Sequence, residues 1–218
     1  MESNTFMPSF QKLVILFTRY PVAGECKTRM IPALGAQGAA HLHRQLVAHI
    51  LSEMSTFLSA RNGTELTIYF DGDSHQQMQD WLGSSYIYKK QQGERLGQRM
   101  AEALIHGTSK GKNPILIGSD CPGINRSILD DAFEALTHND IVIGPAYDGG
   151  YYLVGVAADI QPAACKQLFK QISWGTNIVL SQTLVQIKKL NLRYHLLDKL
   201  HDIDTAEDLK HFNYCPHP

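Results

Sequence analysis

Short apolar runs alternate with longer amphipathic segments along most of this chain. Short runs bounded by turn residues are typical of buried strands, whereas apolar positions repeating every three or four residues indicate helices. The first pattern predicts strands at 13–18, 65–70, 86–89, 114–118, 141–144, 151–156 and 193–197. The second predicts helices at 37–60, 74–82, 96–106, 125–137, 163–169, 177–189 and 206–212, with Asn125 as the cap of its helix.

The order of these elements predicts the fold class. Strands that alternate with helices form a mostly parallel sheet with helices on both faces. The connection between residues 144 and 151 is too short for a crossover helix, so the strand from Tyr151 should return antiparallel to the preceding one. We therefore expect an α/β fold, a three-layer α/β/α sandwich with a mixed sheet of about seven strands, in a single domain spanning residues 1–218.

Composition and charge exclude several classes of function. The chain has 218 residues, and 20 Lys and Arg against 21 Asp and Glu give a net charge of -1, so we expect no nucleic-acid partner. Four widely spaced cysteines form no C-x-x-C pair, which argues against a zinc ribbon or a disulfide framework and favours a reducing, cytoplasmic location. The apolar runs are too short to predict a membrane span.

Acidic residues follow three of the predicted strands. The motifs are Gly118-Ser119-Asp120-Cys121-Pro122, Asp148-Gly149-Gly150-Tyr151 and Asp202-Ile203-Asp204-Thr205. Because ligands of open α/β sheets bind at strand ends, the three motifs together predict one site for a metal ion and phosphates. The alternative for each single Asp is a helix cap or a turn.

The loop after the first strand carries three cationic side chains. Arg19, Lys27 and Arg29 can neutralise phosphate oxygens, and Gly24 allows close approach of the backbone. We expect Lys27 and Arg29 to lie on an exposed loop, so that substitution of either leaves the fold intact. The alternative interpretation is a solvated turn with ordinary surface charges.

Two further segments hold candidate binding residues. Gln92, Gly93 and Gly97 lie in or beside the loop before the helix at 96–106, although Gly97 could serve tight helix packing alone. Trp174 and Thr176 suit a sugar or acceptor, but Thr176 could instead cap the following helix. Tyr151 and Tyr152 alternate across a strand, so one should face the core and the other the cleft.

The ordered motifs resemble those of a known superfamily. They are Pro21-x-x-Gly24-x-x-Lys27-Thr28-Arg29, Gln92-Gly93 with Leu96-Gly97-x-Arg99-Met100, Gly118 to Pro122, Gly144 to Gly155, Trp174-x-Thr176 and Asp202 to Leu209. Together they resemble the nucleotide-diphospho-sugar transferase superfamily, the GT-A fold. More narrowly, they resemble an uncharacterised bacterial glycosyltransferase-like family often linked with arsenosugar biosynthesis and radical-SAM proteins. The chain departs from that family at Thr18-Arg19, Cys26 and Gly175, which bears only on fine specificity.

The resemblance implies that Asp120 and Asp204 are ligands of Mg²⁺ or Mn²⁺, with Asp202 as a substitute ligand. We expect Asp148 to position the acceptor or act as general base, and Lys27 and Arg29 to neutralise charge in catalysis. The expected nucleotide-binding residues are Arg19, Gly24, Lys27, Thr28, Arg29, Gln92, Gly93, Gly97 and Ser119. The expected acceptor-binding residues are Asp148, Gly149, Gly150, Tyr151, Trp174 and Thr176.

Three functions are compatible with these motifs. The first is a metal-dependent glycosyltransferase that moves a sugar from a nucleoside diphosphate sugar to a small-molecule acceptor. The second is a nucleotidyltransferase that releases pyrophosphate from a nucleoside triphosphate, although the chain lacks the Gly-x-Gly-x-Arg pattern common in that branch. The third is a nucleotide-sugar binding module without catalysis. The base, the sugar, the acceptor, the stereochemical outcome, the oligomeric state and the pathway cannot be derived from the sequence.

Overall fold

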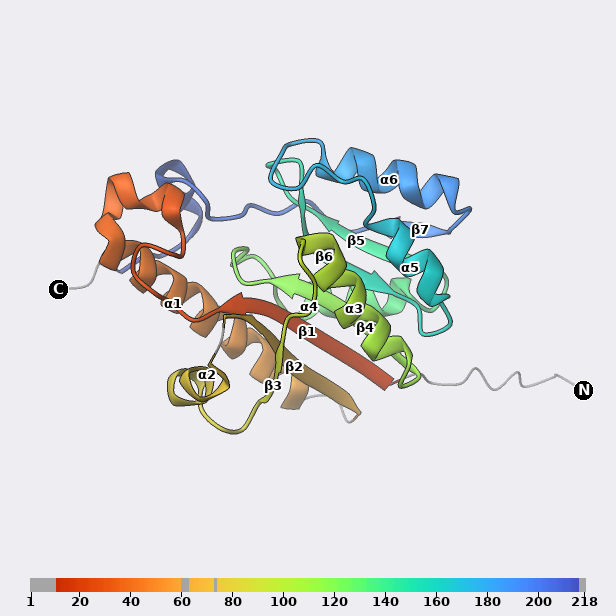
Figure 1. The fold of residues 1–218 in the computed structure, drawn as a ribbon, viewed down its shortest axis with the longest axis horizontal. Coiled ribbons are helices and arrows are strands. Elements are labelled where there is room, and N and C mark those ends of the chain that lie inside the picture. The colour runs from red at the N-terminus through yellow and green to blue at the C-terminus, as the bar shows by residue number, and fades with distance from the viewer. Residues whose placement is uncertain (1–10, 60–62, 73, 216–218) are drawn as a thin grey trace, which may run out of the picture.

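A seven-stranded mixed sheet forms the centre of the protein (Figure 1). The computed structural model describes residues 11–59, 63–72 and 74–215. The strands are β1 (Gln11–Arg19), β2 (Thr64–Asp71), β3 (Ile87–Lys90), β4 (Lys112–Gly118), β5 (Ile141–Pro145), β6 (Tyr151–Val156) and β7 (Tyr194–Leu196). Their order in the sheet is β3-β2-β1-β4-β6-β5-β7.

The strand β6 is antiparallel to both of its neighbours, as the short connection before it predicts. It pairs with β4 through Leu116 and Val154 and with β5 through Ile143 and Val154. The other strand pairs are parallel. Because β1, β2 and β4 are parallel neighbours, the loops that follow their carboxyl ends meet at one edge of the sheet.

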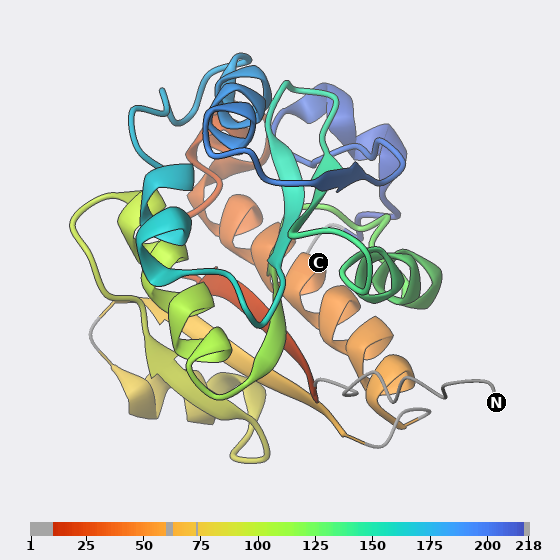
Figure 2. The same cartoon turned by 90° about the vertical axis from the view of Figure 1, so that its right-hand side faces the viewer.

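Helices cover both faces of the sheet, which confirms the three-layer prediction (Figure 2). The elements are α1 (Ile31–Ser59), α2 (His75–Leu82), α3 (Leu96–Thr108), α4 (Arg126–Ala135), α5 (Pro162–Leu168) and α6 (Val179–Lys189), with short 3₁₀ helices η1 (Thr28–Met30) and η2 (Ala206–His211). One buried cluster joins the sheet to α1, α2 and α4, with Phe57 stacked on Phe133 at 6.0 Å. A second cluster joins the other face to α3, α5 and α6.

Several boundaries differ from the sequence prediction. The first long helix begins at Ile31 rather than at residue 37 and bends at Gly35, whose φ of 69° is non-helical; its predicted last residue, Ala60, lies outside the described residues. Asn125 caps α4 as predicted, since its Oδ1 accepts a hydrogen bond from the Ile128 N–H at 3.2 Å. The predicted final helix is a 3₁₀ helix.

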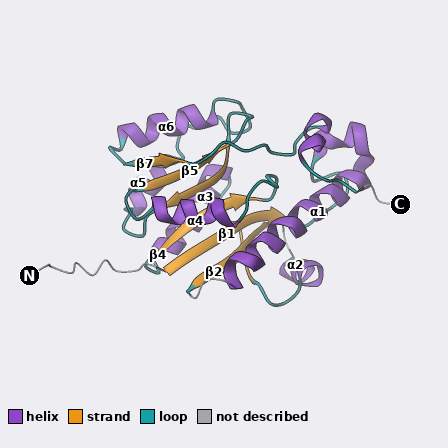
Figure 3. Cartoon of the chain, turned by 180° about the vertical axis from the view of Figure 1, so that it is seen from behind, coloured by secondary structure: helices purple, strands orange, loops and turns teal. Residues whose placement is uncertain are grey.

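The chain between β7 and η2 crosses the carboxyl edge of the sheet in an extended conformation. The N–H of Leu200 donates to the carbonyl of Pro145 at 3.1 Å, and the N–H of Ile203 donates to that of Asp120 at 2.8 Å. Ile203 is buried with Met30 and Leu42, and the C-terminal segment packs beside the first turns of α1 (Figure 3). This crossing segment brings Asp202 and Asp204 to the ends of distant strands.

One carboxylate attaches β7 to the body of the sheet. The Asp140 side chain accepts hydrogen bonds from the Arg193 N–H at 2.7 Å and from its Nη2 at 3.0 Å. Burial alone would raise the pKa of Asp140, but the hydrogen bonds from Arg193 outweigh it and hold the pKa below its ordinary value. The ionised form of Asp140 therefore stabilises the folded protein.

We expect Asp140→Asn to lower the Tm at neutral pH. A depressed folded-state pKa gives stability that is present above the unfolded pKa of about 4 and lost as the pH falls through the folded value. The difference in Tm between the variant and the wild type should therefore shrink between about pH 5 and pH 3. Thermal melts across this range test this, with exposed Asp131→Asn as control. A difference that stays constant down to pH 3 would contradict the role of the charge.

Candidate functional site

A pocket of about 740 Å³ opens at the carboxyl edge of β1, β2 and β4. This first pocket is formed by the loop after β1, the ends of β2 and β4, the start of α3 and the crossing segment. Its lining residues are Phe17, Thr18, Arg19, Glu25, Cys26, Lys27, Thr28, Arg29, His43, Asp71, Gln91, Glu94, Leu96, Arg99, Gly118, Ser119, Asp120 and Asp204. Arg19, Lys27, Thr28, Arg29 and Ser119 were predicted to bind nucleotide, so the structure brings most of that set together.

Lys27 lies at the centre of the first pocket. Its Nζ is 2.9 Å from Asp120 Oδ1 and 3.1 Å from Asp204 Oδ1, and it also donates to the carbonyl of Ile203. Only 4% of its side chain is exposed, so the expectation of an exposed lysine is wrong. The cause is its backbone: Lys27 has a left-handed φ of 48°, and at the start of η1 its side chain turns inward toward the two carboxylates.

The charges of Lys27 and Asp120 stabilise each other. Burial alone would lower the pKa of Lys27, but the nearby Asp120 and Asp204 carboxylates raise it above its ordinary value. Burial would raise the pKa of Asp120, and the Lys27 ammonium more than offsets this and lowers it. Both groups are therefore ionised at neutral pH, as a site for phosphates and a cation requires.

Three arginines surround the outer part of the first pocket. Arg29, with 63% of its side chain exposed, reaches Asp204 Oδ2 at 3.5 Å, which agrees with the predicted exposure. Arg19 and Arg99 both contact Asp71, each at 2.9 Å. Neither Asp71 nor Arg99 is among the site residues predicted from the sequence. The available signal was their position, since Asp71 ends a parallel strand beside β1 and Arg99 lies in the first turn of α3.

His43 and Gln91 are further residues of the first pocket that the sequence analysis did not single out. His43 lies on the buried stripe of α1, with its Nε2 3.3 Å from Thr18 Oγ1 and 3.1 Å from the carbonyl of Arg19. Burial lowers its pKa, so we assign it a neutral ring. Gln91 Nε2 donates to the carbonyls of Thr18 and Tyr69. Both side chains hold the end of β1 in place below the cationic loop.

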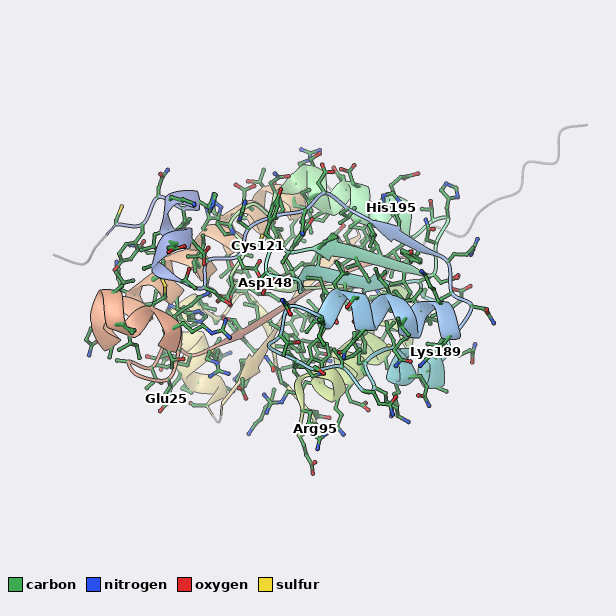
Figure 4. All side chains as sticks on the ribbon, turned by 90° about the horizontal axis from the view of Figure 1, so that it is seen from above. Glu25, Arg95, Cys121, Asp148, Lys189 and His195 are labelled. Carbon is green, nitrogen blue, oxygen red and sulfur yellow. The ribbon has the colours of Figure 1, made fainter. Side chains whose placement is uncertain are left out.

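A second, smaller pocket of about 210 Å³ adjoins the first. The two share Phe17, Leu96 and Gly118. The other residues that line the second pocket are Met100, Leu116, Asp148, Gly150, Tyr151, Tyr152, Leu153, Val154, Trp174, Gly175, Thr176, Val179 and Asp202. Most of the predicted acceptor-binding residues therefore lie together, apart from the cationic loop. Figure 4 shows Asp148 at the end of the sheet where β5 turns back into β6.

The acidic residues are divided between the two pockets. Asp120 and Asp204 line the first pocket, whereas Asp148 and Asp202 line the second. The Oδ1 atom of Asp202 is buried and has no hydrogen-bond partner among the described residues. Burial, followed by the charges of Asp148, Asp120 and Asp204, raises the pKa of Asp202 to about 7. Asp202 thus lines a different pocket from the two carboxylates that contact Lys27, while it remains close enough to feel their charges.

Five of the predicted binding residues line neither pocket. Gly24, Gln92 and Gly93 lie in the loops that supply Glu25, Gln91 and Glu94 to the first pocket, and the carbonyl of Gly93 accepts a hydrogen bond from Arg99 Nε at 2.9 Å. Gly149 has a φ of 91°, and an added Cβ would lie 2.1 Å from the carbonyl oxygen of Asn177. These positions shape the loops that hold the lining residues. The fifth is Gly97.

Gly97 packs against Trp174 and does not face the first pocket. An added Cβ would lie 2.9 Å from the carbonyl oxygen of Phe169 and 3.0 Å from Trp174. The contact fixes the indole at the entrance of the second pocket, beside the edge of Tyr151 at 6.2 Å. Thr176 does not cap α6: its hydroxyl donates to the carbonyl of Ser173, and the cap position is Ile178. Its alternative role as a helix cap is therefore wrong.

We expect Gly97→Ala to displace Trp174 and to destabilise the protein by about 1–3 kcal/mol through overpacking. The indole should become more exposed, with a red-shifted emission. Because Trp81 is the other tryptophan, the measurement is made in a Trp81→Phe background. Gly111→Ala is the control for the emission spectrum, because a Cβ there meets nothing within 4 Å; its φ of 67° adds a backbone strain that Gly97 does not have, so this control does not apply to the change in stability. An unchanged emission spectrum in Gly97→Ala would show that the contact does not hold the ring.

The first pocket has the donor set for a hard divalent cation. Asp120 and Asp204 converge on one cationic atom, the Nζ of Lys27. Within the described ranges, no group of three or more His, Cys, Asp or Glu side chains could hold a metal by itself. Mg²⁺, however, is bound in phosphoryl-transfer sites by one or two carboxylates and the substrate phosphates rather than by a cage of protein ligands. The residues present therefore fit a metal that arrives with a nucleotide.

None of the helices in the described part of the chain is long and apolar enough to span a membrane.

The fold and the site define an α/β protein of the nucleotide-diphospho-sugar transferase type. Residues 56–176 match the family described as "Uncharacterized protein conserved in bacteria (DUF2064)", and the chain belongs to this family. A crystal structure from Desulfovibrio desulfuricans G20, of a "putative nucleotide-diphospho-sugar transferase", is 32% identical. The match covers 92% of this chain and 85% of that chain, with a TM-score of 0.82.

A curated relative and a further solved structure are also similar to this chain, the second in fold alone. The 2-phospho-L-lactate guanylyltransferase of Methanobrevibacter smithii is 23% identical over 188 residues, which cover 85% of this chain and 77% of that protein. The 4-diphosphocytidyl-2C-methyl-D-erythritol synthase of Anaerococcus prevotii is 12% identical, with a TM-score of 0.60 over 92% of this chain and 94% of that chain. The guanylyltransferase and the Desulfovibrio protein support an enzyme of the transferase class. The link to arsenosugars and radical-SAM proteins stays a prediction.

Proposed function

We propose that this protein is a metal-dependent nucleotidyltransferase, which transfers a nucleotidyl group from a nucleoside triphosphate to a small acceptor. The observation that carries the proposal is the buried Lys27 between Asp120 and Asp204, inside a pocket also lined by Arg19, Arg29 and Arg99. These cations suit the charge of a triphosphate, and the two carboxylates suit its divalent ion. The guanylyltransferase relative favours this reaction over glycosyl transfer.

The proposed reaction is a displacement at the α-phosphorus. An oxygen of the acceptor forms a new bond to the α-phosphorus, and the bond from that phosphorus to the bridging oxygen of the β-phosphate breaks. Pyrophosphate leaves with the electron pair of the broken bond, and the acceptor proton goes to a base. Lys27 and Arg29 then face oxygens that gain negative charge, which is where cationic side chains contribute most to the rate.

Asp120 and Asp204 would hold the divalent ion in this proposal. When bound, Mg²⁺ or Mn²⁺ supplies positive charge that offsets that of the phosphates. Lys27 reaches both carboxylates and the pocket, so its ammonium can remain between them and the phosphate oxygens. Asp202 lines the second pocket, and the proposed binding of the ion does not require it.

Asp148 is the proposed general base or positioning group for the acceptor. Its Oδ1 accepts a hydrogen bond from the Gly150 N–H at 2.8 Å, which fixes the side chain in the turn between β5 and β6. The carboxylate lines the second pocket, which adjoins the first at Gly118. A proton acceptor at that boundary lies beside the path from the acceptor to the α-phosphorus.

The leaving group distinguishes this proposal from the two other functions that the motifs allow. With Mn²⁺ and a panel of nucleoside triphosphates, we expect slow release of pyrophosphate and a nucleoside monophosphate, because water can replace the unknown acceptor. A parallel panel of sugar nucleotides should give no nucleoside diphosphate. Phosphorus NMR identifies each product after the Mn²⁺ has been removed, and Asp131→Asn serves as a matched variant with an exposed carboxylate changed.

The same assay can overturn the proposal. Nucleoside diphosphate from a sugar nucleotide, without pyrophosphate from any triphosphate, would establish glycosyl transfer. Nucleotide binding that raises the Tm without forming any product, with or without added amino alcohols and sugars, would establish a binding module.

A further inference from the structure

The second pocket differs from the first in the sign of its charges. Its charged lining residues are Asp148 and Asp202, and the described residues around it include no Lys, Arg or His. The first pocket, in contrast, is lined by several cationic side chains, with Lys27 at its centre. A phosphate or carboxylate group in the second pocket would therefore face like charges with no cationic side chain in the lining. Lys27 of the first pocket acts on Asp202 but is paired with Asp120 and Asp204.

We propose that the second pocket binds a small acceptor through a positively charged nitrogen, so that the substrate is an ammonium compound carrying the nucleophilic oxygen. The proposal rests on the function proposed above and names the acceptor class of that site. Asp202 provides the first observation, because its carboxyl group lines the pocket beside Asp148, its Oδ1 has no hydrogen-bond partner among the described residues, and no cationic side chain lines the pocket to balance the two carboxylates. An ammonium group is a ligand of the charge that balances them.

The aromatic walls of the pocket supply the second observation. Trp174 and Tyr151 meet edge to face at 6.2 Å, and Phe17 lies at the boundary with the first pocket. Aromatic faces attract cations, and cages of such rings combined with carboxylates are the usual sites for quaternary ammonium groups. Gly97 holds the indole of Trp174 in place, so this wall is fixed before any ligand binds.

The volume and position of the second pocket limit the size of the acceptor and the direction of its nucleophilic oxygen. A volume of about 210 Å³ equals that of about seven water molecules, which admits only a small molecule. Its boundary with the first pocket is Gly118, where the absence of a side chain leaves space within 4 Å of a Cβ position. With the nitrogen held between Asp202 and Trp174, the nucleophilic oxygen would project past Gly118 toward the nucleotide.

The decisive experiment measures the binding of simple probes to the full chain by Trp174 fluorescence in the Trp81→Phe background. The probes, at constant ionic strength and pH 8, are choline, dimethylbutanol as the uncharged isostere in which carbon replaces nitrogen, and inorganic phosphate. We expect saturable quenching by choline, with affinity at least tenfold above that of the isostere, and no competition by phosphate. Asp202→Asn should weaken choline binding at least tenfold, and Asp131→Asn should not change it.

Any of the following three results would overturn the inference. Equal affinity for choline and dimethylbutanol would show an apolar pocket that does not recognise charge. Phosphate that displaces choline, or quenches by itself, would indicate a phosphorylated acceptor group. Displacement of choline by Mn²⁺ alone, lost in Asp202→Asn, would make Asp202 a metal ligand. A normal Tm for Asp202→Asn confirms that the variant is folded; if it is not, Trp174→Leu provides the same comparison by thermal shift.

The outcome can be separated from that of the proposed function. A nucleoside triphosphate with Mn²⁺ should raise the Tm of Asp202→Asn as much as that of the wild type, because the first pocket is unchanged. Pyrophosphate release without choline binding would retain the nucleotidyltransferase and remove the ammonium acceptor. Choline binding without pyrophosphate release would retain the acceptor pocket and remove the reaction.

Discussion

Asp120→Asn is expected to abolish the metal-dependent binding of nucleotide and to lower turnover by about a hundredfold or more. The amide keeps the shape of the side chain but carries no charge to balance a divalent ion. Wild-type protein with Mn²⁺ and a nucleotide at about a hundred times its dissociation constant should gain about 2.7 kcal/mol, a rise in Tm of several degrees. The variant should show no Mn²⁺-dependent part of this rise.

Each shift for Asp120→Asn is measured against the Tm of the same variant without ligand, because loss of the contact with Lys27 also changes the stability. Asp131→Asn is the matched control, since it removes one exposed carboxylate that lines neither the first nor the second pocket. Asp204→Asn should resemble Asp120→Asn, as both carboxylates contact the same ammonium. If Asp120→Asn kept the full Mn²⁺-dependent shift, the metal assignment would be wrong.

Lys27→Ala is expected to affect both stability and activity. Removal of the ammonium takes away the cation that Asp120 and Asp204 share and leaves Asp204 with only the longer contact to Arg29. Breaking a fully buried ion pair costs about 3–5 kcal/mol, and since 45% and 35% of the two carboxylate side chains are exposed, we expect about 1–3 kcal/mol. Turnover should fall by about a hundredfold or more, because the cation faces the leaving phosphates.

Arg29→Ala separates the loss of activity expected for Lys27→Ala from its loss of stability. Its guanidinium is mostly exposed and only 3.5 Å from Asp204 at its nearest, so this variant should lose activity while its Tm stays within about 1–2 °C of the wild type. Denaturant unfolding and product assays on both variants test the difference. Lys27→Ala with wild-type stability would mean that the side chain is not held inside the pocket in solution.

The sequence alone predicted most of the secondary structure, because the signals for strands and turns are local. Each buried strand appears as a short apolar run, and the brief connection before Tyr151 leaves no room for a crossover helix. The antiparallel β6 and the three layers follow from these local facts. The start of α1 was missed because Gly35 interrupts the helical pattern. The strand order is non-local, since the place of β6 between β5 and β4 depends on its pairing with β4, in which Ile117 lies opposite Leu153.

For the site, the sequence by itself determined which residues end the parallel strands and which loop carries the cations, since residue type and position along the chain are enough for both. Only the tertiary structure decided which of these residues line the first pocket and which line the second. The crossing segment delivers Asp204 to Lys27 and Asp202 to the aromatic pocket, although the two are neighbours in sequence. A left-handed backbone at Lys27 buries a charge that composition predicts to be exposed. The physical reason is that burial and charge pairing depend on side chains distant in sequence, which no local pattern contains.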